Sequence, residues 1–331
     1  MSITMLSTAA TGIVAGQETL ENIGNNITNI GSRSFKRTSV SVKDNFYHSE
    51  RASSSSPQGS GSNIAPIQIG TGCQVVSVTT DFVKGHKEET GRASDLYLDG
   101  RGYFKVKDSI SNVDYASRSG DFRIDDRKFF VTTEGYRLQA HMNVQAAMPT
   151  YRAIVDNGNL VYERVDPVNA NAPGAISDVV MDYSVSTANN RLVNHTGNVY
   201  TDEQISAQAP TVKSYNIDQT GNISFVMTDD NIVTIGQILL MDFNDEQALT
   251  KEGKALYSNF AAAGPLPFGL DTSKPGSGRL AKVHAGALES SNVDLTQEFT
   301  LMMGTQRVVQ ACARVVTTAD EIYQELVNLK R

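Results

Sequence analysis

The chain has 331 residues, which is enough for two or three compact units with cores of their own. Its 26 Gly, 9 Pro and lack of Trp favour many short strands and turns over a dense enzyme core. The formal net charge of −7 at pH 7 comes without clusters of Lys and Arg, which argues against a nucleic-acid surface. Cys73 and Cys312 are too few and too far apart for a disulfide framework or a spaced metal site, so we expect two small buried hydrophobes.

Targeting and membrane segments are not evident in the sequence. The start lacks a basic region followed by an apolar core and a small-residue cleavage site, so we expect no removable Sec-type signal. No apolar run reaches about 18 residues, and we therefore expect no membrane span.

Residues 1–30 form the first predicted element, an amphipathic helix. Its apolar residues recur at steps of three, four or seven: Leu6, Ala10, Ile13, Leu20, Ile23, Ile27 and Ile30. The polar stretch NNITNIGSRSFKR, residues 25–37, follows directly. We expect Asn25, Asn26 and Asn29 to cap the helix end and to hydrogen-bond adjacent backbones; a simple C-cap and turn is the alternative.

Residues 31–80 are predicted as a linker and extended region. Within it, residues 50–65 are dominated by Ser and Gly and cannot bury enough apolar surface to become ordered alone. This stretch is expected to be flexible or ordered by a partner.

The hydrophobic period then changes to two, in residues 81–140 and again in 212–285. DLYLDGRGYFKVKD predicts a hairpin around DGRG, and the stretch that follows predicts a meander of short antiparallel strands. After residue 211, QTGN and TDDN are predicted turns and VTIGQILLMDF a buried strand. The two segments are expected to form one central antiparallel β domain, with residues 141–211 as a small β-rich inserted outer subdomain.

Residues 286–331 contain the last predicted element, a long helix. Its apolar stripe is Leu295, Phe299, Met302, Val309, Cys312, Val315, Ala319, Ile322, Leu326 and Leu329. Asn292 and Asp294 are candidate N-caps. The stripes of the two terminal helices either pack within their own domain or meet other copies of the chain.

We find no constellation of residues suited to catalysis, metal binding or a cofactor. The five His residues are scattered singly, at 48, 86, 141, 195 and 284, and Asp125 with Asp126 is typical of a turn. Phosphate-loop and nucleophile-elbow motifs are absent. The protein is therefore not expected to be an enzyme.

Several motifs together resemble the flagellar rod and hook family. The element at Asn25, Asn26, Ile27 and Asn29, followed by Gly31, Phe35 and Lys36, is similar to the family's N-terminal signature, with Thr28 where Ala is usual. DLYLDGRGYFKV, SRSGDFRID, VTIGQILLMDF and AGALESSNVDLTQEF resemble four further motifs in the family's order. All of the chain except the Ser- and Gly-rich linker and residues 141–211 is covered.

The resemblance implies an α+β fold in which the terminal helices form a coiled-coil layer. It implies a polymer interface made by two sets of residues. The first set is Leu6, Ile13, Leu20, Ile23, Asn25, Asn26, Ile27, Asn29, Phe35 and Lys36. The second is Leu295, Phe299, Met302, Val309, Val315, Ile322, Leu326 and Leu329.

By the same resemblance the subunit passes uncleaved through the flagellar type III export apparatus and assembles outside the cell as a flexible helical tube that transmits torque. Its partners are other copies of itself and other rod, hook-cap and hook-filament junction proteins. SSNVDL and LVNLKR resemble the hook protein, which we expect, whereas FKR and IGTG resemble the distal rod protein, the alternative. A carbohydrate-active or adhesive β protein would explain the strands but leaves both helical stripes without a purpose.

Overall fold

A computed structural model of the chain describes residues 2–51, 65–142, 150–156, 159–165, 176–181, 212–228, 230, 232–267 and 273–329. The chain divides into two compact units. Unit 1 consists of Met1–Val83 and Ser291–Arg331, and unit 2 of Lys84–Ser290.

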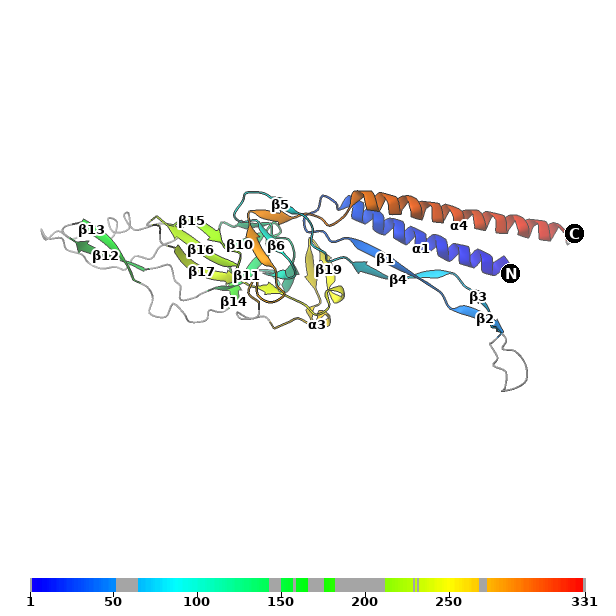
Figure 1. Ribbon diagram of the computed structural model, residues 1–331, viewed down its shortest axis with the longest axis horizontal. Helices are drawn as coiled ribbons and strands as arrows, with labels where there is room; N and C mark the ends of the chain where they lie inside the picture. Colours follow the sequence, from blue (N-terminus) through cyan, green and yellow to red (C-terminus); the bar gives the residue numbers. More distant parts are fainter. Residues whose placement is uncertain are drawn as a thin grey trace, which may run out of the picture. The chain divides into compact units, whose positions relative to one another are not determined.

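Unit 1 contains the two long helices, α1 (Ser2–Thr28) and α4 (Leu295–Leu329). They lie side by side and run in opposite directions, so that both chain termini lie at the same end of the pair (Figure 1). Asp294 begins α4, because its carboxylate accepts hydrogen bonds from the N–H groups of Thr296 and Gln297. The helix therefore begins where the sequence predicted.

A narrow two-stranded ribbon completes unit 1. Strand β1 (Thr38–Asp44) pairs antiparallel with β4 (Cys73–Thr80), and β2 (Tyr47–Arg51) pairs with β3 (Ile67–Gly70). The ribbon occupies much of the region predicted as linker and extended chain. Most of the linker predicted at residues 50–65 lies outside the described residues.

Unit 2 is built around one antiparallel sheet, whose described strands follow the order β15-β16-β17-β11-β7-β8-β20-β19. In that order they are Val212–Ile217, Asn222–Met227, Ile232–Ile238, Arg137–Met142, Tyr103–Lys107, Asp114–Ser117, Leu256–Ser258 and Thr250–Gly253. Four short strands join at its side: β9 (Phe122–Ile124), β10 (Phe130–Thr132), β14 (Ile176–Asp178) and β18 (Leu240–Met241). The sheet thus combines strands from both predicted β segments.

Smaller elements surround this sheet. Two further strand pairs are β6 (Leu96–Asp99) with β21 (Lys282–Ala285), and β5 (Lys87–Glu89) with β22 (Ala287–Glu289). A separate hairpin pairs β12 (Thr150–Asp156) with β13 (Asn159–Val165). A 3₁₀ turn η1 (Glu246–Ala248) and a one-turn helix α3 (Phe260–Ala263) complete the described elements.

The core of unit 2 is a cluster of aromatic and aliphatic side chains from the sheet and β6. Phe104, Phe122 and Phe130 pack ring against ring at its centre, with centroid distances of 5.3 and 5.4 Å. Gly120 approaches β6 so closely that a Cβ there would meet the carbonyl oxygen of Leu96 at 1.7 Å. Only glycine fits this position.

The predicted DGRG hairpin is wrong. β6 pairs with β21, and β7 pairs with β8, β11 and β18, so the segment turns a corner between two different pairings. Gly100 and Gly102 take φ values of 140° and 125° at this corner. The buried Arg118 guanidinium donates hydrogen bonds to the carbonyl oxygens of both glycines and pairs with Glu289. In a hairpin, backbone N–H groups of the opposite strand would bind such carbonyl oxygens, and here Arg118 does so instead.

Two other expectations need correction. VTIGQILLMDF forms two strands, β17 and β18, since the first pairs with β11 and β16 and the second with β7. Residues 176–181 fell within the predicted insert, but β14 pairs with β11 and both Val179 and Met181 lie in the core. Much of residues 141–211 otherwise lies outside the described part of the chain, and the separate insert stays a prediction.

The antiparallel sheet and the terminal helices match the predicted α+β class. The coiled-coil layer remains a proposal.

Candidate functional site

The two long helices approach each other closely along α1's small residues. A Cβ built on Gly12 would lie 3.0 Å from Cys312 Sγ, and one on Gly16 would lie 2.5 Å from a methyl group of Val309. The row of α4 that faces α1 advances by alternating steps of three and four: Met302, Thr305, Val309, Cys312, Val316 and Ala319. This spacing is that of a coiled-coil seam.

A second apolar row runs along α4, one residue in every seven. We call it the outer row; it consists of Leu301, Val308, Val315, Ile322 and Leu329. Val315 is half-buried, whereas the other four are between 42% and 83% exposed. Because a seven-residue spacing keeps side chains on one side of a supercoiled helix, the outer row is a continuous apolar strip that α1 leaves uncovered.

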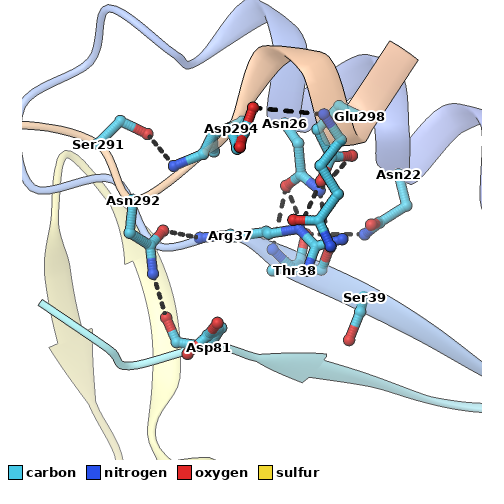
Figure 2. Close-up of polar contacts among 12 residues, drawn as sticks. Asn22, Asn26, Arg37, Thr38, Ser39, Asp81, Ser291, Asn292, Asp294 and Glu298 are labelled. Atoms are coloured by element: carbon cyan, nitrogen blue, oxygen red, sulfur yellow. Dashed lines mark hydrogen bonds and ion pairs between the residues drawn. The ribbon is translucent and has the colours of Figure 1, made fainter. Parts of the chain in front are cut away.

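Where α1 ends, the side chain of Asn26 joins the helix to the ribbon. Its amide nitrogen donates to the Thr38 carbonyl oxygen at 2.7 Å, and its amide oxygen accepts from the Thr38 N–H at 3.0 Å (Figure 2). Asn26 therefore binds the first residue of β1 as a neighbouring strand would. Asn22, one turn earlier, donates to the Thr38 hydroxyl at 2.8 Å.

Glu298, on the first turns of α4, is fully buried beside this contact. Its carboxylate pairs with the Arg37 guanidinium and accepts a hydrogen bond from the Asn26 amide (Figure 2). A buried carboxylate needs such partners, because desolvation without them costs several kcal/mol. The pair thus ties α4 to the residue that precedes β1.

Asn292 completes the cluster from the segment before α4. Its side-chain oxygen accepts from the Arg37 N–H at 2.7 Å, and its nitrogen donates to the carbonyl oxygens of Asp81 and Val83 at 2.9 and 3.0 Å. Lys36 Nζ also donates to the Val83 oxygen at 2.9 Å. Asn26, Arg37, Thr38, Asn292 and Glu298, which we call the junction cluster, therefore hold both helices and both long ribbon strands together.

The predicted site residues fall into three classes by exposure. Ile23, Asn26 and Lys36 are buried. The half-buried residues are Ile13, Leu20, Ile27, Asn29, Phe35, Met302, Val309 and Val315. The exposed residues are Leu6, Asn25, Leu295, Phe299, Ile322, Leu326 and Leu329.

The asparagines of the opening motif have different roles. Asn29 donates to the Asn25 carbonyl oxygen at 2.9 Å and so caps the last turn of α1, while Asn26 binds the adjacent ribbon. Asn26 and Lys36 thus make contacts inside the chain, and the predicted polymer interface stays a prediction.

Sequence reasoning missed most of the junction cluster. Arg37 and Thr38 gave no signal, because their partners lie on distant segments. Glu298 offered one: it stands three residues after Leu295 and four before Met302, where the helical seam should be apolar. A charge at a seam position indicates a buried polar partner.

The described side chains include no group of three His, Cys, Asp or Glu residues placed to hold a metal ion. Within the same residues, no helix is both long and apolar enough to cross a membrane. The arrangement joins and orders chain segments, and its chemistry is that of packing and hydrogen bonding.

Comparison with known proteins identifies the class of this architecture. The family described as "Flagellar hook protein FlgE/F/G D1 domain" matches residues 97–170, and "Flagellar basal body rod FlgEFG protein C-terminal" matches residues 284–329. The flagellar basal-body rod protein FlgG of Bacillus subtilis (strain 168) is 29% identical over 326 residues, which cover 98% of each chain. The flagellar hook protein FlgE of Escherichia coli (strain K12) is 24% identical over 422 residues, covering 98% of this chain and 99% of that protein.

A crystal structure of the Helicobacter pylori flagellar hook protein FlgE2 is also similar, at 11% identity and a TM-score of 0.22. That likeness covers 69% of this chain and 47% of the other, and it is too low to bear on the fold. The sequence matches are the stronger finding. The chain belongs to the flagellar rod and hook family and is a component of the bacterial flagellum.

Proposed function

We propose that this protein is a structural subunit that polymerises through its terminal helices into a helical tube of the flagellar axis. The observation that carries the proposal is the outer row of α4, from Leu301 to Leu329. Pairing with α1 already orders the helix, so an apolar row in which four of five residues are exposed is best explained by burial against neighbouring copies. A contact that repeats from subunit to subunit without closing builds a helical assembly.

The lengths of the two helices support the same proposal. α4 has 35 residues and α1 has 27, so the last turns of α4 extend beyond their partner. Leu326 lies at a seam position there and is 54% exposed. In the proposed tube the helices form the coiled-coil layer, the junction cluster fixes its register to the ribbon, and the exposed predicted residues contact other subunits.

Two positions along the axis are candidates, the hook and the distal rod. The hook was the expectation from SSNVDL and LVNLKR. A specific observation supports the distal rod: the alignment to the rod relative spans 326 residues, close to the 331 of this chain, whereas the alignment to the hook relative spans 422 and must carry long gaps. The Bacillus subtilis rod protein thus agrees better than the Escherichia coli hook protein in length as well as in identity.

The remaining parts of the proposal concern partners and route. We infer that the subunit meets other copies of itself, other rod proteins, and either the hook-cap and hook-filament junction proteins or their rod counterparts. We infer also that it leaves the cell uncleaved through the flagellar type III export apparatus. No nucleic acid, cofactor or catalytic step enters this function.

Electron cryo-microscopy of the purified full chain at increasing concentration tests the proposal. We expect tubes in which α1 and α4 form a continuous layer with the outer row buried between subunits. A curved tube would favour the hook and a straight one the distal rod. A chain that stays monomeric at its highest soluble concentration, or tubes whose outer row faces solvent, would contradict the proposal.

A further inference from the structure

The turn between β7 and β8 presents an apolar side chain to solvent. Ile110 at its tip is 92% exposed, and Val113 beside it is 45% exposed. A single exposed apolar residue is common on protein surfaces and by itself needs no explanation. Here, however, the turn is built to hold Ile110 in place.

Polar contacts order this turn. The Asp108 carboxylate accepts from the Ile110 N–H at 2.9 Å and from the Ser111 hydroxyl at 2.6 Å. Backbone hydrogen bonds between Asp108 and Val113 and between Asn112 and Asp108 close its base. Because the turn is already ordered, burying Ile110 against a partner would cost little conformational entropy.

Unit 2 also has an apolar depression of about 400 Å³. Leu266, Pro267 and Leu280 supply its accessible apolar surface, and Leu240, which also lines it, is fully buried. Asp242 and Arg279 line it as an ion pair. Ser273 and residues 277–280 form part of its wall, and the segment 273–282 around them contains Lys274, Arg279 and Lys282 and no carboxylate. The turn that carries Ile110 has acidic Asp108 at its base, and the three basic residues of segment 273–282 outnumber the single described lining carboxylate, Asp242, so apolar and charged parts of the two surfaces are complementary.

The turn follows the last residue of β7, whereas the depression lies beside the first residues of β7 and the segment before it. Leu240 pairs with Phe104 and Leu280 bridges Arg101, whereas the turn begins after Lys107. The six steps of extended chain from Arg101 to Lys107 span roughly 20 Å, and the three steps from Phe104 to Lys107 span roughly 10 Å before the turn begins. Ile110 therefore cannot enter the depression of its own molecule.

We propose that Ile110 of one subunit inserts into the depression lined by Leu240, Leu266 and Leu280 of a second copy of this chain. The inference rests on the proposed function, a homopolymer. Each copy contributes one turn and one depression, and their separation makes the contact head-to-tail, as a helical assembly requires. It gives the tube a second contact that is independent of the terminal helices.

Substitution at the tip tests the energetic part. In the full chain, Ile110→Asn should raise the critical concentration for tube formation about tenfold to hundredfold, because burial of one aliphatic side chain is lost. The matched control Ile110→Leu keeps apolar character and should stay within about threefold of the original chain. Both variants should fold normally, since Ile110 contacts solvent in the monomer. Equal critical concentrations for the two variants would overturn the proposal.

A photoreactive benzophenone amino acid at position 110 tests the geometry in assembled full-length chains. We expect cross-links between subunits that map to residues 240–242 or 266–280, and none there from the same group at exposed Ser214. Tubes whose cross-links from position 110 map elsewhere, or do not form, would overturn this inference and leave the proposed function standing. A chain that forms no tubes would overturn both.

Discussion

The amide side chain of Asn26, at the end of α1, makes the two backbone hydrogen bonds to Thr38 that a neighbouring strand would otherwise make. It is 1% exposed and meets both the N–H and the C=O of Thr38, so its loss would leave two backbone groups and the Glu298 carboxylate short of partners. Leaving buried polar groups unsatisfied costs about 1–3 kcal/mol. We expect Asn26→Ala to lower the free energy of unfolding of unit 1 by about 2–3 kcal/mol. Urea unfolding followed by the helical circular dichroism signal measures it.

Asn25→Ala is the matched control for this prediction. Asn25 is the preceding residue of the same helix, is exposed, and its side-chain oxygen accepts a local hydrogen bond from Asn29. Its replacement should change the unfolding free energy by less than about 0.5 kcal/mol. Equal effects of the two substitutions would show that Asn26 acts through helix propensity and not through the ribbon.

Two buried tyrosines make unit 2 sensitive to alkaline pH. Burial raises the pKa of Tyr103 and of Tyr257 far above the usual value, and their rings pack edge to face at 5.5 Å. In the unfolded chain both phenols ionise near pH 10. Above that pH the unfolded state therefore binds fewer protons than the folded state. Stability that is fully present below pH 10 is then lost as pH rises, at up to about 1.4 kcal/mol per pH unit for each tyrosine.

The test compares the full chain with Tyr257→Phe between pH 9 and pH 11. The phenylalanine variant should lose stability less steeply with pH, by about 1.4 kcal/mol per unit, because one ionising group is gone. Denaturant unfolding at each pH gives the slopes, and the ultraviolet absorbance of phenolate reports ionisation directly. Parallel slopes would mean that Tyr257 ionises in the folded state.

Among the elements, the α1–α4 pair depends on how closely two glycines allow it to pack. Gly16 has no room for a methyl group beside Val309, whose branched side chain is stiff, whereas nothing lies within 4 Å of a Cβ on Gly24. We expect Gly16→Ala to destabilise unit 1 by about 1–2 kcal/mol through overpacking. Gly24→Ala should stabilise it by about 0.5–1 kcal/mol through helix propensity. Thermal unfolding of both variants gives the two signs.

If Gly16→Ala were also stabilising, the helices would tolerate a wider separation than the one observed. The seam would then not depend on small residues.

Local patterns predicted the elements better than their partners. The steps of three and four after Asp294 identified α4 and its start, because cap and periodicity are both local signals. Alternation likewise identified β6 and β7. It could not show that Leu98 pairs with Val283, and the DGRG glycines suggested a hairpin where the chain turns a corner around Arg118. A glycine-rich turn fits both structures equally well.

The junction cluster was beyond local prediction for the same reason. Arg37 and Glu298 are 261 positions apart, and the motifs in which they stand do not show that the two side chains pair. The opening asparagine motif did predict polar contacts at the end of α1. Successive side chains on a helix point in directions about 100° apart, so the asparagines face different neighbours. The sequence does not show where β1 lies, and it therefore cannot show which asparagine contacts the ribbon and which caps the helix.

At the scale of the whole molecule, the chain separates the segments proposed to polymerise from a β unit with its own core. Unit 1 contains both termini and the outer row, and unit 2 contains the aromatic core. If assembly is a property of unit 1's exposed rows, substitutions there should change polymerisation without changing the folding of either unit.

Leu326 and Leu329 test this separation most sharply. They are 54% and 83% exposed on the last turns of α4, so replacing both with Asp should change monomer stability by less than about 1 kcal/mol. In a tube, burial of two leucines contributes roughly 3–6 kcal/mol per contact, and buried unpaired carboxylates would add a further penalty. We therefore expect the double variant to melt like the original chain and to form no tubes.

The control adds the same two charges away from the apolar rows, at Gln324 and Asn328, which are also exposed on these turns. Gln324→Asp with Asn328→Asp should polymerise nearly normally, since solvent-facing carboxylates cost little and are screened by salt. Melting and tube formation are measured on the same preparations. If the leucine variant forms tubes, the contact lies elsewhere on the chain. If neither variant forms tubes, the added net charge is the cause. Loss of tube formation in the leucine variant alone supports burial of this helix end between subunits.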